Sequence, residues 1–556
     1  MADTVDEDRD HLHSMGYAQE LHRGMSTFSN FAISFSIISI LAGGMTSFWL
    51  GMVTSGPRVI TMGWIIVGFF ALLVGMAMGE ICSAYPTAGG LYYWSAKLAR
   101  KNQARWAWFT GYFNLIGQIG VIASVDYALS IFIGYFIRMF DDSFKLTSGT
   151  IFVIYLIVLV VHGLLNTFSV NLVKIFGDIS VWWHVAGAAI IAGVLFIAPT
   201  NKRGIGGAFD AAPPGMTGWT GGVMVTIYLF SLGLLLAQYT ITGFDASAHV
   251  SEETVGARTE APKAIVRAIY VSAIAALIMN LAMIAALPKK GAEGDALYTA
   301  ITFGDAGDPF LVNAAPRLIS SALGTGAAKL LVFIAIVGQF FCGLASVTAN
   351  SRMIYAFSRD NALPGSKIWH KINPKTRTPT NSVWLGIALS AIVGSSSLYV
   401  AGKGAGRFST AFFAMTGICV IGLYISYAIP IYLRLTNPEF KVGPWNLKGR
   451  HKIVGWTALV WIALISVLFV APLFWPFWTP WGEENKFLVT ETGDEFFKQN
   501  NFNFTGPLIL LAAIFVMGYW RFSGKKWFTG PKVQGTPEEL RAIERELDAV
   551  EHGRAV

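Results

Sequence analysis

One carboxylate, that of Asp245, lies inside an apolar run that extends from Tyr228 to Val250. The run is long enough to cross a bilayer, because about 20 apolar residues span the hydrocarbon core. An ionisable side chain at that depth is costly and usually faces a cavity, a partner or a substrate. Gly243 weakens the helix at the same place. The pattern predicts a membrane helix that is interrupted near Asp245.

A second interruption is expected about 200 residues earlier, at Gly43 and Gly44 in the apolar segment ISILAGGMTSF. Two adjacent glycines disfavour a continuous helix by roughly 1 kcal/mol each relative to alanine. If the helix breaks there, the backbone N–H groups of Ala42, Gly43 and Gly44 face inward and offer a site for a carboxylate. The alternative is that the glycine pair only lets two helices pack closely.

Breaks at corresponding places of two repeats are typical of a substrate site in the middle of the membrane. Exposed carbonyls near Ile40, Tyr239 and Ile241 could accept hydrogen bonds from a substrate ammonium, and Asp245 could oppose its charge. The alternative role for Asp245 is to cap the second half-helix, since aspartate favours the N-cap position. A capping carboxylate in such a cavity could also act as a protonation switch.

Three side chains are candidates for proton coupling, namely Asp245, His184 and Asp126. His184 lies in the fifth apolar span, and a histidine titrates near neutral pH. Its alternative role is that of a buried histidine with satisfied hydrogen bonds. Asp126 shares the third span with Asn114 and Gln118, which are four residues apart and therefore on one helix face. The alternative for this group is hydrogen bonding between helices, worth about 0.6 kcal/mol per contact.

Motifs of enzymes and of metal sites are not found in the sequence. There is no phosphate-binding loop of the Walker type, so ATP hydrolysis is not predicted. His162, His184 and His249 do not have the spacing of metal ligands. No nucleophile stands beside a base. We therefore expect no catalytic residues, no metal and no cofactor.

The composition predicts a membrane protein. Of the 556 residues, 54% are hydrophobic and 13% are charged, against about 25% charged in a soluble domain. The net charge of +8 is scattered over short loops, so we expect a lipid bilayer and not nucleic acid as the partner. Twelve apolar spans are expected, at 27–54, 60–82, 105–138, 149–168, 173–198, 222–250, 264–287, 327–350, 381–400, 409–434, 453–475 and 505–521.

The charges of the loops predict the orientation. Lysine and arginine gather in the second, eighth and tenth loops, whereas the eleventh loop, around 483–495, is acidic. Cytoplasmic loops carry the excess of basic residues, so both termini are predicted to be cytoplasmic. The N-terminus has no apolar stretch of a signal peptide.

The spans divide into five, five and two, which is typical of an inverted-repeat transporter with two added helices. We expect a cytoplasmic segment at 1–26, a first five-helix repeat at 27–198 and a second at 222–434. Helices 11 and 12 follow at 453–521, and a cytoplasmic tail at 522–556. Surface helices are expected at AAPRLISSALG and at TPEELRAIERELDAVE.

Four stretches carry a resemblance to a known family. They are GYAQELHRGMSTFSNFAISFSIISILAGG (16–44), GEICSAYPTAGGLYYWSAKLA (79–99), YTITGFDASAHVSEET (239–254) and SRMIYAFSRDNALP (351–364). In these stretches the chain resembles the amino acid–polyamine–organocation permease superfamily and, within it, the amino acid/choline transporter family. The resemblance implies twelve helices, of which the first and sixth are unwound around the substrate.

The resemblance also implies roles for single residues. The carboxylate site of the family would fall on Ala42, Gly43 and Gly44, and its amine and gating segment on Gly243, Phe244, Asp245 and Ala246. Proton-coupled relatives carry a lysine midway along the fifth helix, where this sequence has His184. Proton coupling, substrate exchange or no coupling all occur in the family.

The predicted function is that of a secondary permease in the plasma membrane. It would carry a small zwitterionic or cationic amine, such as an amino acid or GABA, by alternating access, with proton coupling favoured over sodium. A choline or polyamine carrier and an amino acid exchanger are alternatives on the same fold. A channel or a membrane receptor is the alternative from another class.

Overall fold

The computed structural model describes residues 2–168, 170–217, 219, 222–304, 308, 310–400, 407–471 and 503–551. These residues form helices, with two isolated β-bridges and no strand among them. Twelve helices are long and apolar enough to cross a membrane. The predicted all-α membrane fold is therefore confirmed. The acidic loop expected at 483–495 lies outside the described residues.

The membrane spans occur where the apolar runs predicted them. The first consists of α2 (Thr27–Ile37), η1 (Ile40–Gly44) and α3 (Phe48–Thr54), and the second of η2 (Val59–Gly63) and α4 (Trp64–Ala84). The others are α6 (Gln103–Arg138), α7 (Ser148–Phe168), α8 (Val170–Ile197), α9 (Val223–Thr240), α11 (Ala257–Ala286), α14 (Thr325–Arg359), α16 (Thr380–Val400), α17 (Arg407–Thr436), α18 (His451–Val470) and α20 (Thr505–Phe522).

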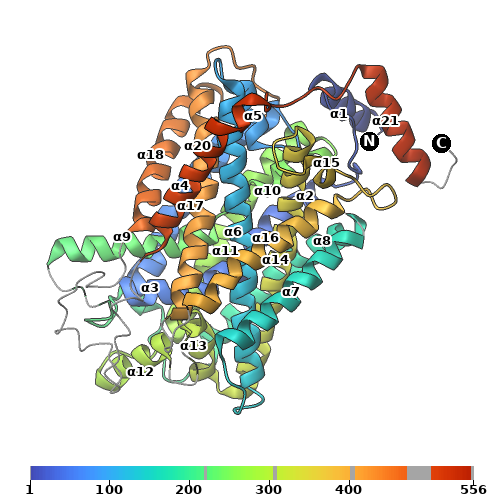
Figure 1. The fold of residues 1–556 in the computed structure, drawn as a ribbon. Helices are drawn as coiled ribbons and strands as arrows, with labels where there is room; N and C mark the ends of the chain where they lie inside the picture. The colour runs from blue at the N-terminus through green and yellow to red at the C-terminus, as the bar shows by residue number, and fades with distance from the viewer. Residues whose placement is uncertain are drawn as a thin grey trace.

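Short helices cover both ends of the bundle (Figure 1). At one end lie α1 (Ala2–Ser14), α5 (Leu91–Leu98), α15 (Ser366–Trp369) and α21 (Pro537–Glu551), together with both chain termini. At the other end lie α12 (Ala292–Phe303) and α13 (Ala314–Leu323). The two predicted surface helices are thus confirmed as α13 and α21. Large apolar side chains such as Ile453, Val460 and Val467 of α18 are exposed on the outside of the bundle, where lipid would cover them.

The first membrane span is interrupted one turn before the glycine pair that predicted the break. Helix α2 ends at Ile37, and Ser39 has an extended backbone with φ −60° and ψ 116°. A single π-helical turn, η1, then contains Gly43 and Gly44. Such turns inside helices are frequent at functional sites. The Ser39 side chain accepts a hydrogen bond from the Ala42 N–H at 3.0 Å, which explains why the new turn begins after this residue.

The sixth span is interrupted at the predicted place. Helix α9 ends at Thr240, and five residues separate it from the short α10 (Ala246–His249). Between them Gly243 has φ +89°, a conformation that residues with a side chain rarely adopt. The two broken helices hold the same position in each set of five spans.

The N-terminal segment and the C-terminal tail lock together at the end of the bundle that carries the termini. The Glu544 carboxylate of α21 accepts a hydrogen bond from the backbone N–H of Gln19 at 2.7 Å and lies 2.6 Å from the His13 ring. Gln534 bonds the backbone at Gly16 and Ala18. The backbone of Met25 in turn pairs with that of Thr254, at the end of the sixth span. The first and last parts of the chain therefore cover the same face.

Replacing Glu544 with alanine is expected to release α21, because two contacts with the N-terminal segment are lost. Limited proteolysis should then cut the tail several times faster, while the melting temperature of the membrane bundle changes little. Glu546→Ala is the matched control, since Glu546 is exposed on the same helix. Equal cleavage rates in both variants would contradict the role of Glu544.

Candidate functional site

The two broken helices meet at their interruptions. A Cβ atom added to Gly43 would lie 2.9 Å from both the Cα and the Oγ1 of Thr240, so the two backbones approach closely at this point. On one side of the breaks, Ser34 of α2 donates to the Phe244 carbonyl at 2.9 Å. On the other side, Ser47 donates to the Leu236 carbonyl at 3.3 Å. The two interruptions are therefore held against each other by a close approach of their backbones and by hydrogen bonds from two serine side chains to carbonyls.

The amides that were expected to face a substrate carboxylate are partly engaged in this conformation. The N–H groups of Ala42 and Gly43 bond the Ser39 carbonyl at 3.2 and 2.9 Å. The close approach of Gly43 to Thr240 also supports the packing role that was the alternative for this glycine. Gly44 is less confined, since a Cβ there would lie 3.5 Å from the Met279 side chain. Gly43 is therefore a packing position, whereas Gly44 has more free space around it.

The groups expected to hold an ammonium are buried around the second break. Ile40 begins η1, and Tyr239 lies in the last turn of α9. The carbonyl of Ile241 accepts a bond from the Tyr424 hydroxyl at 3.4 Å. The Tyr239 hydroxyl bonds Ser124 at 3.1 Å, and its ring meets Phe412 edge-on. All of these residues are buried, so the site is closed to solvent in this conformation.

Asp245 is fully buried at the second break, and its carboxylate is surrounded by hydrogen-bond donors. The Tyr427 hydroxyl donates to Oδ1 at 2.7 Å. The amides of Asn114 and Gln118 each donate to Oδ2 at 3.1 Å, and the His249 ring lies 3.2 Å from the same oxygen. Asp245 stands at the N-cap position of α10, but its side chain accepts no hydrogen bond from the backbone N–H groups of that helix. The capping role considered from the sequence is therefore wrong for this conformation.

Asn114 and Gln118 share a helix face, as their spacing predicted, and use it to bind Asp245. His249 and Tyr427 were not among the predicted site residues. His249 could have been found, because it lies four residues after Asp245 and faces it along one helix turn. Tyr427 comes from α17, which is 182 residues away along the chain, and no local pattern pointed to it.

His184 contacts the first break directly. Its Nε2 lies 2.5 Å from the Ser39 hydroxyl, and its Nδ1 lies 2.8 Å from the Ser180 carbonyl. Because a carbonyl only accepts hydrogen bonds, Nδ1 carries the proton and Nε2 accepts from Ser39. Both ring nitrogens are thus satisfied, as the structural alternative required. The contact nevertheless lies at the interruption of the first span.

Asp126 lies apart from the Asp245 cluster and pairs with a different histidine. Its Oδ2 is 3.1 Å from Nδ1 of His162 on α7, and both side chains are fully buried. Among the described residues, the Asp126 Oδ1 and the His162 Nε2 have no hydrogen-bond partner. This candidate for proton coupling therefore contacts α7 and not the breaks.

Two buried ion pairs close the end of the sixth span that lies near the termini. Arg352 of α14 donates to Glu253 at 2.8 Å, and Arg359 donates to Glu252 at 3.0 Å. All four side chains are buried. Glu252 and Glu253 therefore fix this end of the sixth span to α14. We call these two ion pairs the gate pairs.

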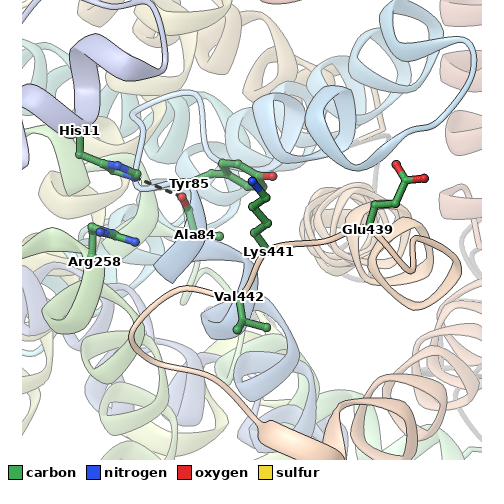
Figure 2. A pocket seen from close by; sticks show the side chains of 7 residues that line it. All are labelled: His11, Ala84, Tyr85, Arg258, Glu439, Lys441 and Val442. Atoms are coloured by element: carbon green, nitrogen blue, oxygen red, sulfur yellow. Dashed lines mark hydrogen bonds between the residues drawn. The ribbon is translucent and has the colours of Figure 1, made fainter.

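A pocket of about 440 Å³ opens on the same end of the molecule (Figure 2). His11 and Arg258 lie on one side of it and Glu439 on the other. The His11 ring lies 3.3 Å from the Ala84 carbonyl. Burial and the neighbouring Arg258 lower the pKa of His11. None of the predicted site residues lines this pocket, so it is separate from the breaks.

Groups of three or more potential metal ligands are absent from the described part of the chain. The site is thus built from backbone groups, hydroxyls, amides and one acid–histidine pair. These groups can bind a small polar molecule and a proton.

Comparison with known proteins gives consistent matches over nearly the whole chain. A family model described as amino acid permease matches residues 25–518. Amino-acid permease BAT1 of Arabidopsis thaliana is 36% identical over 534 residues, which cover 94% of this chain and 95% of that protein. The homologue of that permease in Oryza sativa subsp. japonica is 36% identical over 529 residues, 94% of each chain. The GABA-specific permease of Saccharomyces cerevisiae is 29% identical over 475 residues, 83% of this chain and 78% of the relative.

Proposed function

Because the chain belongs to the amino acid permease family, we propose that it is a proton-coupled secondary transporter of the plasma membrane. Membership of the family makes it a multi-pass membrane transporter of amino acids and not an enzyme. It moves a small zwitterionic amino acid, with GABA as one candidate, by alternating access. Both of its termini face the cytoplasm.

The observation that supports this proposal most strongly is the close contact between the two interruptions. Gly43 and Thr240 bring the backbones together, and the bonds from Ser34 and Ser47 lie on either side. Discontinuous helices paired in this way bind substrate between two repeats that rock against each other. A channel would need an open path, whereas the residues of this site are buried.

The environment of Asp245 bears on the charge of the substrate. Tyr427, Asn114, Gln118 and His249 already surround its carboxylate. A permanently cationic substrate such as choline or a polyamine would have to displace these groups. A zwitterion can instead place its ammonium at the carbonyls of the breaks and its carboxylate at the Gly44 amide, and at those of Ala42 and Gly43 once they release the Ser39 carbonyl. We therefore favour an amino acid, and the printed name of the yeast relative adds GABA to the candidates.

The contact of His184 with Ser39 supports proton coupling. A second proton on His184 would sit on Nε2 and face the Ser39 hydroxyl, which now donates to that atom. Ser39 would have to turn its hydroxyl away, and this residue holds the first turn after the break through Ala42. Protonation of His184 would thus act on the hinge of the first span. Exchange without proton flow is the alternative mode.

The test is uptake of a labelled panel by proteoliposomes that contain the purified chain. The panel holds neutral amino acids, GABA, choline and putrescine, with and without imposed proton and sodium gradients. We expect saturable amino acid uptake, acceleration by an inward proton gradient and no effect of sodium. Uptake of choline or putrescine alone would contradict the substrate class, and acceleration by sodium alone would contradict the coupling ion.

Replacing Asp245 with asparagine is expected to lower uptake about tenfold with the fold retained. The new amide would turn a donor toward one of the four surrounding groups, and a lost bond to a charged group costs about 1.5–3 kcal/mol. Asp126→Asn is the comparison, because it removes the other acid that pairs with a histidine in the bundle. Elution as a single species in gel filtration checks folding. Unchanged uptake at every pH would remove Asp245 from the mechanism.

A further inference from the structure

Asp245 and His249 form an acid–histidine pair whose hydrogen bonds require a proton between the two side chains. We propose that this pair is a proton-binding site of the transport cycle and that its proton holds the gate pair of Glu252 and Arg359 closed. The proposal rests on the proposed function and adds a residue, His249, and a route from the middle of the membrane to the gate. It follows from three features of the geometry.

The first feature is the partner of His249 Nδ1. This atom lies 2.9 Å from the carbonyl oxygen of Ala88, in the turn that precedes α5. A carbonyl has no proton to give, so Nδ1 must carry one. The tautomer of His249 is thereby assigned from its partner. Any proton gained or lost by this ring in the structure concerns Nε2.

The second feature is the contact between Nε2 and Asp245. Nε2 lies 3.2 Å from Oδ2, and both side chains are fully buried. Without a proton between them, two lone pairs would face each other in a site that excludes water. With one proton, the pair is either an imidazolium facing a carboxylate or a neutral ring facing a carboxylic acid. Both forms have zero net charge, which a buried site tolerates far better than an isolated charge.

The other groups around the pair cannot supply that proton at neutral pH. The donors from α6 are the amides of Asn114 and Gln118. Helix α17 presents the hydroxyl of Tyr427, which keeps its own bond to Oδ1. Tyr424 and Cys419, also on α17, lie within electrostatic range of Asp245 and are uncharged in their protonated forms. The proton is therefore exchanged with the solvent or with the substrate.

The third feature is the connection to the gate pairs. The backbone of Ala88 accepts from His249 through its carbonyl and donates through its N–H to the Glu252 carboxylate at 2.9 Å. Glu252 is in turn bound by Arg359. One residue thus joins the proton site to a gate pair. The neighbouring Gly90 has φ +49°, and a Cβ on it would lie 3.2 Å from the His249 ring, so the turn fits closely around the ring.

Loss of the proton would leave a net negative charge on the pair and repulsion between Nε2 and Oδ2. The ring could relieve this only by moving away from Asp245, against the turn at Ala88. Such a movement would disturb the bond between Ala88 and Glu252. Proton release in this way favours opening at the end of the molecule where the termini lie, which we propose is cytoplasmic.

The first test measures the pair itself and does not depend on transport. Nitrogen-15 NMR of the histidine-labelled full chain reports which ring nitrogens carry protons, and His249→Gln identifies the signal. We expect a protonated Nδ1 and an Nε2 that either carries a proton or accepts a hydrogen bond from the Asp245 carboxylic acid, and the Nε2 signal should change in Asp245→Asn. An Nε2 signal of a free, unbonded acceptor would mean that the pair holds no proton. An unprotonated Nδ1, or a His249 signal that is identical in Asp245→Asn, would overturn the proposal.

The second test uses proteoliposomes and compares His249→Gln with His162→Gln. Both variants remove a buried histidine that pairs with an acid, but only His249 connects to the breaks and the gate. We expect His249→Gln to abolish the acceleration of uptake by an inward proton gradient and His162→Gln to retain it. Retained acceleration in His249→Gln would overturn the role of the pair. If the unmodified protein takes up amino acids without any response to protons, the proposed coupling fails, and the NMR result still decides whether the pair holds a proton.

Discussion

Replacing Arg352 with glutamine is expected to lower the free energy of unfolding by about 3–5 kcal/mol, because it leaves a buried carboxylate without its partner. Arg352 and Glu253 are both fully buried and bond through two guanidinium nitrogens. Their attraction offsets the cost of removing two charges from water only while both are present. The measurement is thermal and denaturant unfolding of the purified protein in detergent.

The control for Arg352→Gln is Arg100→Gln. Arg100 lies 3.9 Å from Glu439, and its side chain is 60% exposed, so this change should cost less than about 1 kcal/mol. The double variant Arg352→Gln with Glu253→Gln should recover much of the loss, since neither charge remains. Equal destabilisation by the two single arginine variants would contradict the account of the gate pair.

Arg352→Gln should also shift the transport cycle. The gate pairs join the end of the sixth span to α14, so weakening one of them favours the conformation that is open at that end. A cysteine introduced near Glu253 should then react faster with a thiol reagent. The native Cys82, Cys342 and Cys419 are buried and give a low background. An unchanged labelling rate would show that the ion pair stabilises the fold without gating it.

Replacing Gly43 with valine is expected to reduce transport at least about a hundredfold. The first added carbon already meets the Cα of Thr240 at 2.9 Å, and a backbone atom cannot turn aside as a side chain can. Overpacking of this kind costs typically about 1–3 kcal/mol, and the branched side chain adds to it. The strain falls on the contact between the two interruptions, where we propose that substrate binds. Uptake and the stabilisation of the protein by bound amino acid are the two measurements.

Gly44→Ala is the matched control for Gly43→Val. The Cβ of an alanine at position 44 would lie 3.5 Å from the flexible Met279 side chain, which is an ordinary contact distance. We expect uptake by this variant to stay within about threefold of the unmodified protein. Loss of transport in Gly43→Val with substrate affinity retained would mean that Gly43 only packs. Equal losses in both variants would indicate that the flexibility of the glycine pair matters more than the contact with Thr240.

The membrane spans could be predicted because each is a long apolar run, and the composition of the chain left lipid as the solvent. The second break was also local information, since Gly243 needs its positive φ. The first break was misplaced by one turn. The prediction placed the break at the glycine pair, but the turn is set by Ser39, which bonds the Ala42 amide and the His184 ring. Serine is too common in such a sequence to mark that role.

The site was predicted only as far as local patterns reach. Asp245 stood out as an acid in an apolar run, and Asn114 and Gln118 were related by helical spacing. Their contact with Asp245 depends on how α6 packs beside the sixth span, which the sequence does not encode locally. Tyr427 and the bond between Ala88 and Glu252 depend on equally distant contacts. The prediction that Asp245 caps the second half-helix was wrong, because its carboxylate oxygens accept hydrogen bonds from side chains of α6 and α17 instead.

The lock between the two ends of the chain sets an order for biosynthesis. Residues around Gln19 leave the ribosome long before their partners Gln534 and Glu544 are made. Asp360 lies between these segments in the sequence. It accepts hydrogen bonds from the Tyr17 hydroxyl and from the backbone N–H of Lys532, so its contacts are complete only after both segments have been made. A chain still attached to the ribosome can insert its helices but cannot seal this face. This face can therefore form only after the segment that contains Gln534 and Glu544 has been made, and products truncated before that segment should leave the face exposed.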